Sequence, residues 1–394
     1  MSNFSALQVK VLRTLEEVEK MRPVWSVMQS NPESDIDFVS FIATIRPEIV
    51  RPYVVVVYKG SEPISLLVGR VENSHLEAKI GYTTLWRCRV RRLAIFYGGL
   101  MGETSPEVIK LVLQQLLRSL REEKADLLWW NGIPWNTELH QLVTRTPNPL
   151  CRDYLARPCE HWILNLPSSL EEFIEQQMGK RSRQWARKSL RKIEKDFQGE
   201  VSYGCYSAPH DVGKLLEDVI TVAKKTYQWG LGLGFKDTEE NRRRFRLEAD
   251  KGWLRGYVLY LENEPVAFWV SSVYQDTVYL AFTGFDPNFR EYEVGSVLFF
   301  WMVRDLCRQN MRRMDFGLGA SFYKERFCDS KFLETTMSVF TLSFRGVSLN
   351  LVRLLTQGPS QLFQSLLVRS GLEQKIKKLW RVYRTPARES VEPS

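Results

Sequence analysis

The sequence has few of the residues from which metal sites and disulfide frameworks are built. Its 394 residues include 4 histidines and 6 cysteines. No two cysteines have the CxxC spacing, and no histidine lies at the spacing of a zinc motif. We therefore expect no metal and no disulfide framework. The sequence also offers few residues for Ser-His-Asp or Cys-His catalysis.

Long apolar segments are also absent. The longest apolar run, Val297–Val303, is far shorter than the roughly 20 residues of a membrane-spanning helix. The first residues, MSNFSALQVK, do not follow the pattern of a secretory signal. With 44% hydrophobic residues, 26% charged residues and a formal net charge of +9, the composition predicts a cytoplasmic, moderately basic protein of two or three domains.

Two segments share one pattern of strands. Residues Tyr53–Arg70 and Gly256–Val273 each predict a β-hairpin, in which two apolar strands flank a polar turn with a Glu-Pro pair. Each hairpin is followed by a strand (Leu93–Gly98 and Leu280–Gly284), a helix (Pro106–Arg121 and Val294–Cys307) and a buried strand (Ala125–Asn131 and Met314–Gly317). We interpret the halves as two β-β-β-α-β copies, with chance similarity of two α/β segments as the alternative.

The segment between the copies is strongly basic. Ser168 or Ser169 is a suitable N-cap for a helix that becomes basic from Lys180 onward. Its apolar stripe, through which it would pack, consists of Leu190, Ile193 and Phe197. A solvated connecting helix and a surface for an anionic partner (cofactor phosphates, a nucleic acid or lipid headgroups) are equal alternatives.

The second copy contains the candidate chemistry. Residues Tyr279–Phe327 predict a strand, a loop, a helix that starts near a glycine, a short strand, a glycine turn and a short helix. Arg290, Gly295 and Ser296 stand where the strand leads into the helix. The unpaired amides and the positive dipole end of a helix N-terminus suit a pyrophosphate.

This order resembles the GNAT acyl-CoA transferase superfamily, whose phosphate loop has the form Arg/Gln-x-x-Gly-x-Gly/Ala. Arg290 and Gly295 match that form, whereas Glu293 stands where the first glycine belongs. A carboxylate beside a pyrophosphate is unfavourable unless it points away. The first copy has no such motif, and its loop from Gly98 to Pro106 predicts a degenerate unit that shapes the acceptor cleft.

The chain more closely resembles the CelD-like acetyltransferases of cellulose biosynthesis and the related Fem-type aminoacyltransferases. The shared motifs are Phe285-Asp286-Pro287, Asp315-Phe316-Gly317 and Tyr323-Lys324. The resemblance covers about residues 1–345 and is best from Gly252 to Phe340. It implies an α/β fold with mixed sheets, in which two tandem GNAT-like units are joined by a basic helical connector. The expected domains are 1–165 (first unit), 166–200 (connector), 201–347 (second unit, with the active site) and 348–394 (amphipathic helix and disordered tail).

The resemblance also implies roles for individual residues in acyl transfer from a thioester. Asp286 would be the base, although Asp-Pro-Asn is also a favourable turn. Tyr323 would protonate the leaving thiolate, with a core or stacking role as the alternative. Lys324 would stabilise charge in the transition state, with an unremarkable surface lysine as the alternative. Asp315 would order the glycine turn.

Two further sets of residues would bind the substrates. The donor, acetyl-CoA or another acyl-CoA, would contact Arg290, Val294, Gly295 and Ser296. The acceptor cleft would include Tyr227, Trp229 and Asp315, although Tyr227 and Trp229 also suit a buried aromatic anchor.

The last residues predict a basic amphipathic helix. Its apolar face, Leu372, Ile376, Leu379, Trp380 and Tyr383, lies among lysines and arginines. Such a helix can bind an anionic membrane surface at the inner face of the membrane, or dock on its own domain.

Three functions follow, in order of preference. The first is transfer of an acyl group from acyl-CoA to an amine or hydroxyl of a sugar, a polysaccharide precursor or a related metabolite. The second is Fem-type transfer from aminoacyl-tRNA, which the basic connector favours and the lack of a coiled-coil insertion disfavours. The third is a non-catalytic, membrane-peripheral subunit of polysaccharide or lipid assembly.

Overall fold

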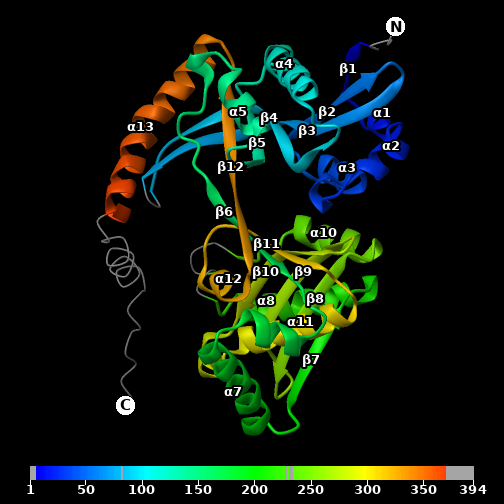
Figure 1. Ribbon diagram of the computed structural model, residues 1–394, viewed down its shortest axis with the longest axis vertical. Coiled ribbons are helices and arrows are strands. Elements are labelled where there is room, and N and C mark those ends of the chain that lie inside the picture. The colour runs from blue at the N-terminus through cyan, green and yellow to red at the C-terminus, as the bar shows by residue number, and fades with distance from the viewer. Residues whose placement is uncertain (1–5, 81–82, 227–228, 230–233, 370–394) are drawn as a thin grey trace.

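The computed structural model describes residues 6–80, 83–226, 229 and 234–369. Figure 1 shows two units, one above the other: most of the first half of the chain and helix α13 lie in the upper unit, and most of the second half lies in the lower unit. Strands β6 (Cys159–Asn165) and β12 (Ser330–Phe340) run between the two units. In the described ranges, no helix is long and apolar enough to cross a membrane.

Twelve strands of the described residues form one continuous sheet, in the order β1-β2-β3-β4-β5-β12-β6-β11-β10-β9-β8-β7. Neighbouring strands are antiparallel, except that β4–β5 and β10–β11 are parallel. The sheet is therefore mixed, as predicted for this α/β fold. The other strands are β1 (Leu7–Leu12), β2 (Ile49–Lys59), β3 (Glu62–Ile80), β4 (Thr83–Gly102), β5 (Leu127–Pro134), β7 (Val201–Tyr206), β8 (Leu254–Leu261), β9 (Glu264–Tyr274), β10 (Thr277–Phe285) and β11 (Arg313–Leu318).

Helices cover the sheet and make the crossovers that parallel strands require. The helices are α1 (Leu15–Glu19), α2 (Arg22–Met28), α3 (Ile36–Ile45), α4 (Pro106–Glu122), α5 (Glu138–Arg145), α6 (Leu170–Glu172), α7 (Lys180–Asp196), α8 (Val212–Ala223), α10 (Glu239–Asp250), α11 (Val294–Arg308), α12 (Phe322–Phe327) and α13 (Phe344–Arg369). Shorter helical turns are η1 (Pro32–Ser34), η2 (Pro149–Cys151), η3 (Phe173–Gln177, a π-turn), η4 (Pro209–Asp211) and η5 (Pro287–Tyr292).

The predicted internal repeat is present. The first copy is β2-β3-β4-α4-β5 and the second is β8-β9-β10-α11-β11. Both predicted hairpins form, and the turn of the second one places Glu262 and Asn263 at positive φ, 52° and 66°. Two consecutive residues of positive φ match the twist that a tight hairpin needs.

The two copies exchange strands at the centre of the sheet. Strand β6 follows the first copy in sequence but pairs with β11 of the second copy. Strand β12 follows the second copy, and its residues 334–340 pair with β5 of the first copy. The first residues of β12 also pair with β6. The predicted boundary at residue 165 thus falls at the end of a strand that the second copy uses, and the domain ranges stay a prediction.

The basic connector differs from the expected continuous helix. Ser169 accepts a hydrogen bond from the Glu172 amide and caps α6, as predicted, but the helix continues only as the π-turn η3. A new helix, α7, starts after Gly179, which has extended backbone dihedrals. Glycine is a poor residue inside a helix and an acceptable N-cap, so the chain breaks here.

The loop of the first copy is shorter than predicted. We expected a loop from Gly98 to Pro106, but β4 continues to Gly102 because Leu100, Met101 and Gly102 pair with β3. Helix α4 begins after Ser105 with Pro106 in its first turn, as predicted. At the other end of the chain, the predicted amphipathic helix from Leu372 to Tyr383 lies outside the described residues.

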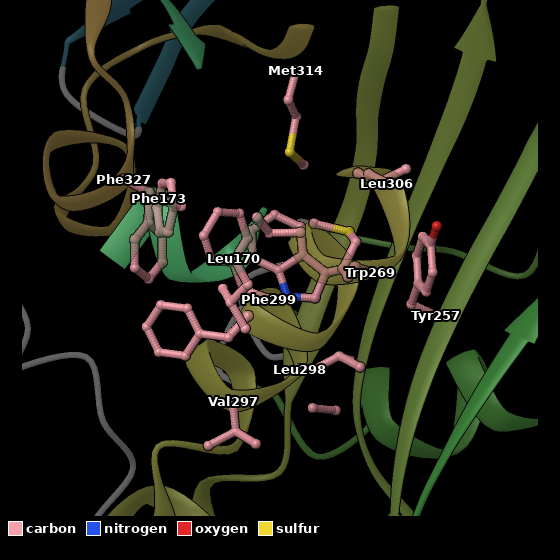
Figure 2. Close-up of a cluster of buried hydrophobic side chains, with 14 of the residues drawn as sticks. Leu170, Phe173, Tyr257, Trp269, Val297, Leu298, Phe299, Leu306, Met314 and Phe327 are labelled. Carbon is pink, nitrogen blue, oxygen red and sulfur yellow. The ribbon is translucent and has the colours of Figure 1, made fainter. Parts of the chain in front are cut away.

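The largest buried hydrophobic cluster of the described residues consists mainly of side chains from α11 and from the strands of the second copy. Figure 2 shows Trp269 and Phe299 among the buried side chains of this cluster, with Phe173 close to Phe327. The rings of Phe299 and Phe327 stack with centroids 4.1 Å apart. Helix α12 is thereby attached to α11, which fixes the distance between the two elements that carry the predicted site.

Candidate functional site

Strands β10 and β11 separate soon after they begin. They pair in parallel only from Thr277–Tyr279 against Arg313–Asp315. Strand β10 then has a register shift against β9 between Leu280 and Phe282, so that the strand bends at this point. The ends of β10 and β11 diverge from there, and the chain leads from β10 through η5 into α11.

The start of α11, where the sequence predicts a diphosphate site, is partly buried. The amides of Ser296 and Val297 both donate to the Glu293 carbonyl, at 2.8 and 3.0 Å. Val294 and Gly295 are the first two residues of the helix, whose amides have no partner within it. Val294 is fully buried, whereas Gly295 and Ser296 are half-buried. Of the predicted donor contacts on this helix, Gly295 and Ser296 are therefore the ones at the surface.

Glu293 caps α11 in a left-handed backbone conformation, with φ 53° and ψ 36°. Glycine adopts this conformation without a steric penalty, which explains physically why a glycine would suit this position. The Glu293 carboxylate lies 4.0 Å from the guanidinium of Arg326 on α12. This ion pair offsets part of the negative charge beside the helix start.

Asp286 directly precedes η5, the helical turn that leads into α11, and Arg290 lies within this turn. Arg290 is exposed, and its guanidinium makes no ion pair with any residue that the structure describes. Asp286 is only 1% exposed. One of its oxygens accepts the Asn288 amide at 3.0 Å and the other lies 2.9 Å from the ammonium of Lys225. Asp286 thus forms the predicted turn and an ion pair at once.

An aromatic group lies beneath the start of α11. The Trp269 indole donates to the Gly295 carbonyl at 3.2 Å. Tyr323, from α12, packs edge-on against Trp269 with ring centroids 5.8 Å apart, and contacts Phe316 at 6.1 Å. Tyr323, which is predicted to protonate the thiolate, is therefore half-buried and packs against the tryptophan that supports the start of α11.

Lys324 is buried rather than on the surface. Its exposed fraction is 6%, and its ammonium donates to the carbonyls of Gly317 and Leu318, at 3.1 and 2.7 Å. Burial lowers the pKa of Lys324 from its ordinary value. The lysine fixes the glycine turn after β11, and one of its three N–H groups is left for another acceptor.

Asp315 orders the glycine turn as predicted, and it also belongs to a network that the sequence did not predict. Its Oδ1 accepts the Gly317 amide at 2.7 Å and lies 2.6 Å from Nε2 of His161 on β6. The other ring nitrogen of His161 is 3.1 Å from Glu334 on β12. Burial alone would lower the pKa of His161, but the hydrogen bonds to Asp315 and Glu334 outweigh it and raise the pKa to about 9.

Tyr97 connects this network to the first copy. Its hydroxyl donates to Glu334 at 2.9 Å, and burial together with this carboxylate raises the pKa of Tyr97. The ring lies so close to Gly132 that a Cβ there would be 2.5 Å away. Tyr97 lies two residues beyond Ile95, the last residue of β4 that pairs with β5, and Asp315 is the last residue of β11 that pairs with β10. The diverging strand pairs of both copies therefore meet at His161.

The predicted acceptor residues are only partly described. Trp229 is 37% exposed, and its amide lies 3.3 Å from the hydroxyl of Thr226. Tyr227 lies outside the described residues. Asp315, the third predicted acceptor residue, is described, and it forms a hydrogen bond with His161, which is 154 residues away in the sequence.

Sequence reasoning missed His161, Glu334 and Tyr97. No local motif marks them, because they come from three strands that are distant in the sequence (β4, β6 and β12), of which β6 and β12 become neighbours only through the strand exchange. Among the described residues, no group of three or more His, Cys, Asp or Glu side chains could hold a metal ion. The signal that could have drawn attention to this region is the position of Asp315 directly before the glycine turn.

A comparison with known protein families finds a match in the second half of the chain. Residues 180–325 match the family described as acetyltransferase (GNAT) domain. This range contains α7, η5, α11 and most of α12. This part of the chain thus resembles a GNAT domain, and the mixed α/β fold of the described residues is consistent with two tandem GNAT-like units. A comparison with curated protein sequences finds no significant match.

Solved structures share the fold over most of the chain. A conserved protein of unknown function from Bacteroides thetaiotaomicron is 14% identical with a TM-score of 0.51, covering 85% of this chain and 100% of its own. The C-terminal domain of a protein described as a lysylphosphatidylglycerol synthetase, from Agrobacterium fabrum, is 12% identical with a TM-score of 0.51, covering 86% and 96%. FemX is 8% identical with a TM-score of 0.54, covering 84% and 97%. At these identities the likeness shows the fold alone.

Proposed function

We propose that this chain transfers an acyl group from acyl-CoA to an amine or hydroxyl acceptor, in the second unit. The observation that carries the proposal is the divergence of β10 from β11 directly before the start of α11, inside the range that matches the GNAT family. Diverging strands leave main-chain groups unpaired for an extended ligand, and the helix start suits its diphosphate.

The proposed reaction has three parts. The acceptor nitrogen or oxygen attacks the thioester carbonyl, the carbon–sulfur bond breaks, and the sulfur takes a proton as it leaves. Tyr323 would supply that proton, and Lys324 would stabilise the negative charge on the carbonyl oxygen of the intermediate. The proton lost by the acceptor goes to a base that we leave unassigned. Asp286 was predicted for this role, but its two oxygens hold Asn288 and Lys225.

The acceptor would enter where the two units meet. Asp315, Glu334 and Tyr97 bring together hydrogen-bonding groups of both copies at this place. The acceptor class that we propose is a sugar, a polysaccharide precursor or a related metabolite, in line with the resemblance to the cellulose-biosynthesis branch. The cytoplasm is the proposed location.

The test uses two variants of the donor site and titration calorimetry with CoA. Replacing Gly295 by Ala keeps the helix, because the new Cβ would meet Phe285 at an ordinary 3.5 Å, yet it places a methyl group at the proposed diphosphate site. We expect Gly295→Ala to preserve the melting temperature and to weaken CoA binding about tenfold, and Arg290→Ala to weaken it by a similar factor. Wild-type protein that binds no CoA would refute the donor assignment.

A second candidate is aminoacyl transfer from tRNA, which the charge of α7 supports. That helix carries eight lysines and arginines and two acidic residues. Filter binding of tRNA over a salt series separates the two candidates, since contacts to phosphates make binding fall steeply with salt. Failure to bind CoA and tRNA, together with binding to anionic liposomes, would favour the non-catalytic membrane-peripheral subunit.

A further inference from the structure

Asp315 has one carboxylate oxygen that the fold uses and one that it does not. Oδ1 accepts the Gly317 amide at 2.7 Å and lies 2.6 Å from Nε2 of His161. Oδ2 has no hydrogen-bond partner within the described part of the chain. Because the Asp315 side chain is 13% exposed, the carboxylate is not sealed off from a ligand.

The two other buried acids near the candidate site have both oxygens engaged. Asp286 holds a main-chain amide and an ammonium. Oε2 of Glu334 accepts the Tyr97 hydroxyl at 2.9 Å, and Oε1 lies 3.1 Å from Nδ1 of His161. The Glu334 side chain is also only 2% exposed. Of these three acids, Asp315 is therefore the one with an oxygen available to a substrate.

Asp315 also lies at the point where β10 and β11 begin to diverge. It is the last residue of β11 that pairs with β10, and its partner there is Tyr279. The proposed donor would run between the two strands, with its diphosphate at the start of α11. The other end of the donor carries the thioester, so the reacting carbonyl would lie toward this apex, beside Asp315.

The Asp315 side chain and α11 lie on opposite faces of the sheet. Met314, labelled in Figure 2, and Phe316 belong to the buried cluster around α11. Side chains alternate along a strand, so Asp315 points to the other face. Tyr279 points the same way, since its hydroxyl lies 3.5 Å from the carbonyl of Ser30 in the first unit. Burial and the charge of Asp315 raise the pKa of Tyr279 to about 12. An acceptor between the two units therefore meets Asp315.

The charged and titratable side chains that face Asp315 come from five other elements. Two carboxylates, Asp315 and Glu334, share one imidazolium. The nearby ammonium of Lys324 donates to main-chain carbonyls instead. Positive charge that develops on an acceptor nitrogen is therefore stabilised beside Oδ2. The facing groups are Tyr97 on β4, His161 on β6, Tyr279 on β10, Glu334 on β12, and Lys324 and Cys328 on α12 and at its end.

We propose that Asp315 is the base of the acyl transfer and that His161 is its positioning residue. The inference rests on the proposed function, whose reaction needs a group that takes the proton of the acceptor. As the acceptor nitrogen or oxygen bonds to the thioester carbon, its proton moves to Oδ2 of Asp315. The carbon–sulfur bond then breaks, and the sulfur leaves with the proton of Tyr323. Water afterwards carries the proton of Asp315 to Tyr323, so the cycle consumes no net proton.

The experiment measures the release of CoA thiol from acetyl-CoA, with glucosamine as the acceptor probe. Asp315→Asn keeps an oxygen for the Gly317 amide and the His161 ring but cannot take a proton. We expect kcat to fall about a hundred- to a thousandfold, with the CoA dissociation constant changed less than about twofold. The wild-type pH profile of kcat/KM should fall at acidic pH, and the variant should lack this acidic limb. The matched control is Asp276→Asn, at a side chain that is 51% exposed, which should keep the wild-type rate and profile.

Two further variants separate proton transfer from structure. In Asp315→Ala, added formate should raise the rate at least about tenfold, because a small carboxylate can replace the lost base. Formate should not change the rate of the wild type. In His161→Gln, the acidic limb should move to higher pH, since a carboxylate without its imidazolium neighbour is easier to protonate.

The possible failures differ from one another. An unchanged kcat in Asp315→Asn, or a lower kcat with the acidic limb retained, would overturn the inference and leave the proposed function standing. Should the melting temperature show that Asp315→Asn is unfolded, the Asp315→Ala measurement decides, and a rate that formate does not raise would also overturn the inference. An unmoved limb in His161→Gln would remove the positioning role of His161. Wild-type protein that releases no CoA thiol would refute the proposed function itself.

Discussion

At the scale of single residues, the candidate site consists of buried polar groups held by main-chain atoms. Lys324 binds two carbonyls of the glycine turn, and Asp315 binds an amide of the same turn. Buried polar groups are costly unless they are paired, so this arrangement fixes the turn in one conformation. A preformed turn is what a site needs if it is to hold a charged intermediate without rearrangement.

Replacing Lys324 tests its role in turnover. We expect Lys324→Ala to lower turnover ten- to a hundredfold, in the range of one lost charge-stabilising group (~10²-fold), while the CoA dissociation constant changes less than about twofold. Steady-state kinetics and calorimetry measure the two quantities. Lys324→Met, which keeps much of the side-chain volume, controls for lost packing, and unchanged turnover in both variants would remove Lys324 from the mechanism.

His161 makes stability depend on pH. Its pKa of about 9 lies above the ordinary 6.5, so the bound proton stabilises the fold below about pH 6.5, and this stabilisation is lost as the pH rises through 9. We expect His161→Gln to lower the free energy of unfolding by on the order of 2 kcal/mol at pH 6 and by much less at pH 10. Urea unfolding of the wild type and the variant at several pH values measures the difference between their free energies of unfolding. Titrating groups that both proteins share contribute equally to the two values and cancel in this difference.

A constant difference across that pH range would show that His161 is not charged in the folded protein. Exposed His210, 85% exposed in its side chain, supplies the matched control. His210→Gln should leave the difference near zero at every pH, since exposed ion pairs contribute little.

At the scale of elements, the exchange of β6 and β12 makes each copy depend on the other half of the chain. Met337 on β12 is 1% exposed and lies in the core of the first copy, among residues of β2, β3 and α4. The stability of the first copy is therefore encoded in part by residues near position 337. Neither copy completes its core with its own five repeated elements.

Met337→Ala tests this dependence. We expect it to reduce the free energy of unfolding by about 2–5 kcal/mol, as for other large-to-small core changes. Leu333→Ala, on the same strand but 43% exposed, should cost about 1 kcal/mol or less. Chemical denaturation measures both, and equal effects would contradict the insertion of β12 into the core of the first copy.

The sequence predicted the elements whose causes are local. Alternating apolar residues and turn-forming residues defined both hairpins, and helical spacing defined α4 and α11. The break at Gly179 was missed because a single glycine does not decide between a cap and a helix interior. The extension of β4 was missed because it depends on pairing with β3, and the His161 network was missed because it depends on the exchanged strands.

At the scale of the whole molecule, both copies direct their diverging strands toward one place. The parallel pairing of β4 with β5 in the first copy ends at Ile95 and Trp130, and that of β10 with β11 in the second copy ends at Tyr279 and Asp315. Only the second copy has an Arg-x-x-x-x-Gly segment at its helix start and the Tyr-Lys pair on the following helix. The proposed donor site therefore lies in the second copy alone, whereas the hydrogen-bond network around His161 includes residues of both copies.

The most direct test of this account is hydrogen–deuterium exchange of the wild-type protein with and without CoA. If the start of α11 holds the diphosphate, CoA should slow amide exchange in residues 290–297 and leave residues 98–109 of the first copy unchanged. Slowing confined to 98–109, or no slowing in 290–297 at a CoA concentration that saturates the protein, would contradict the central claim.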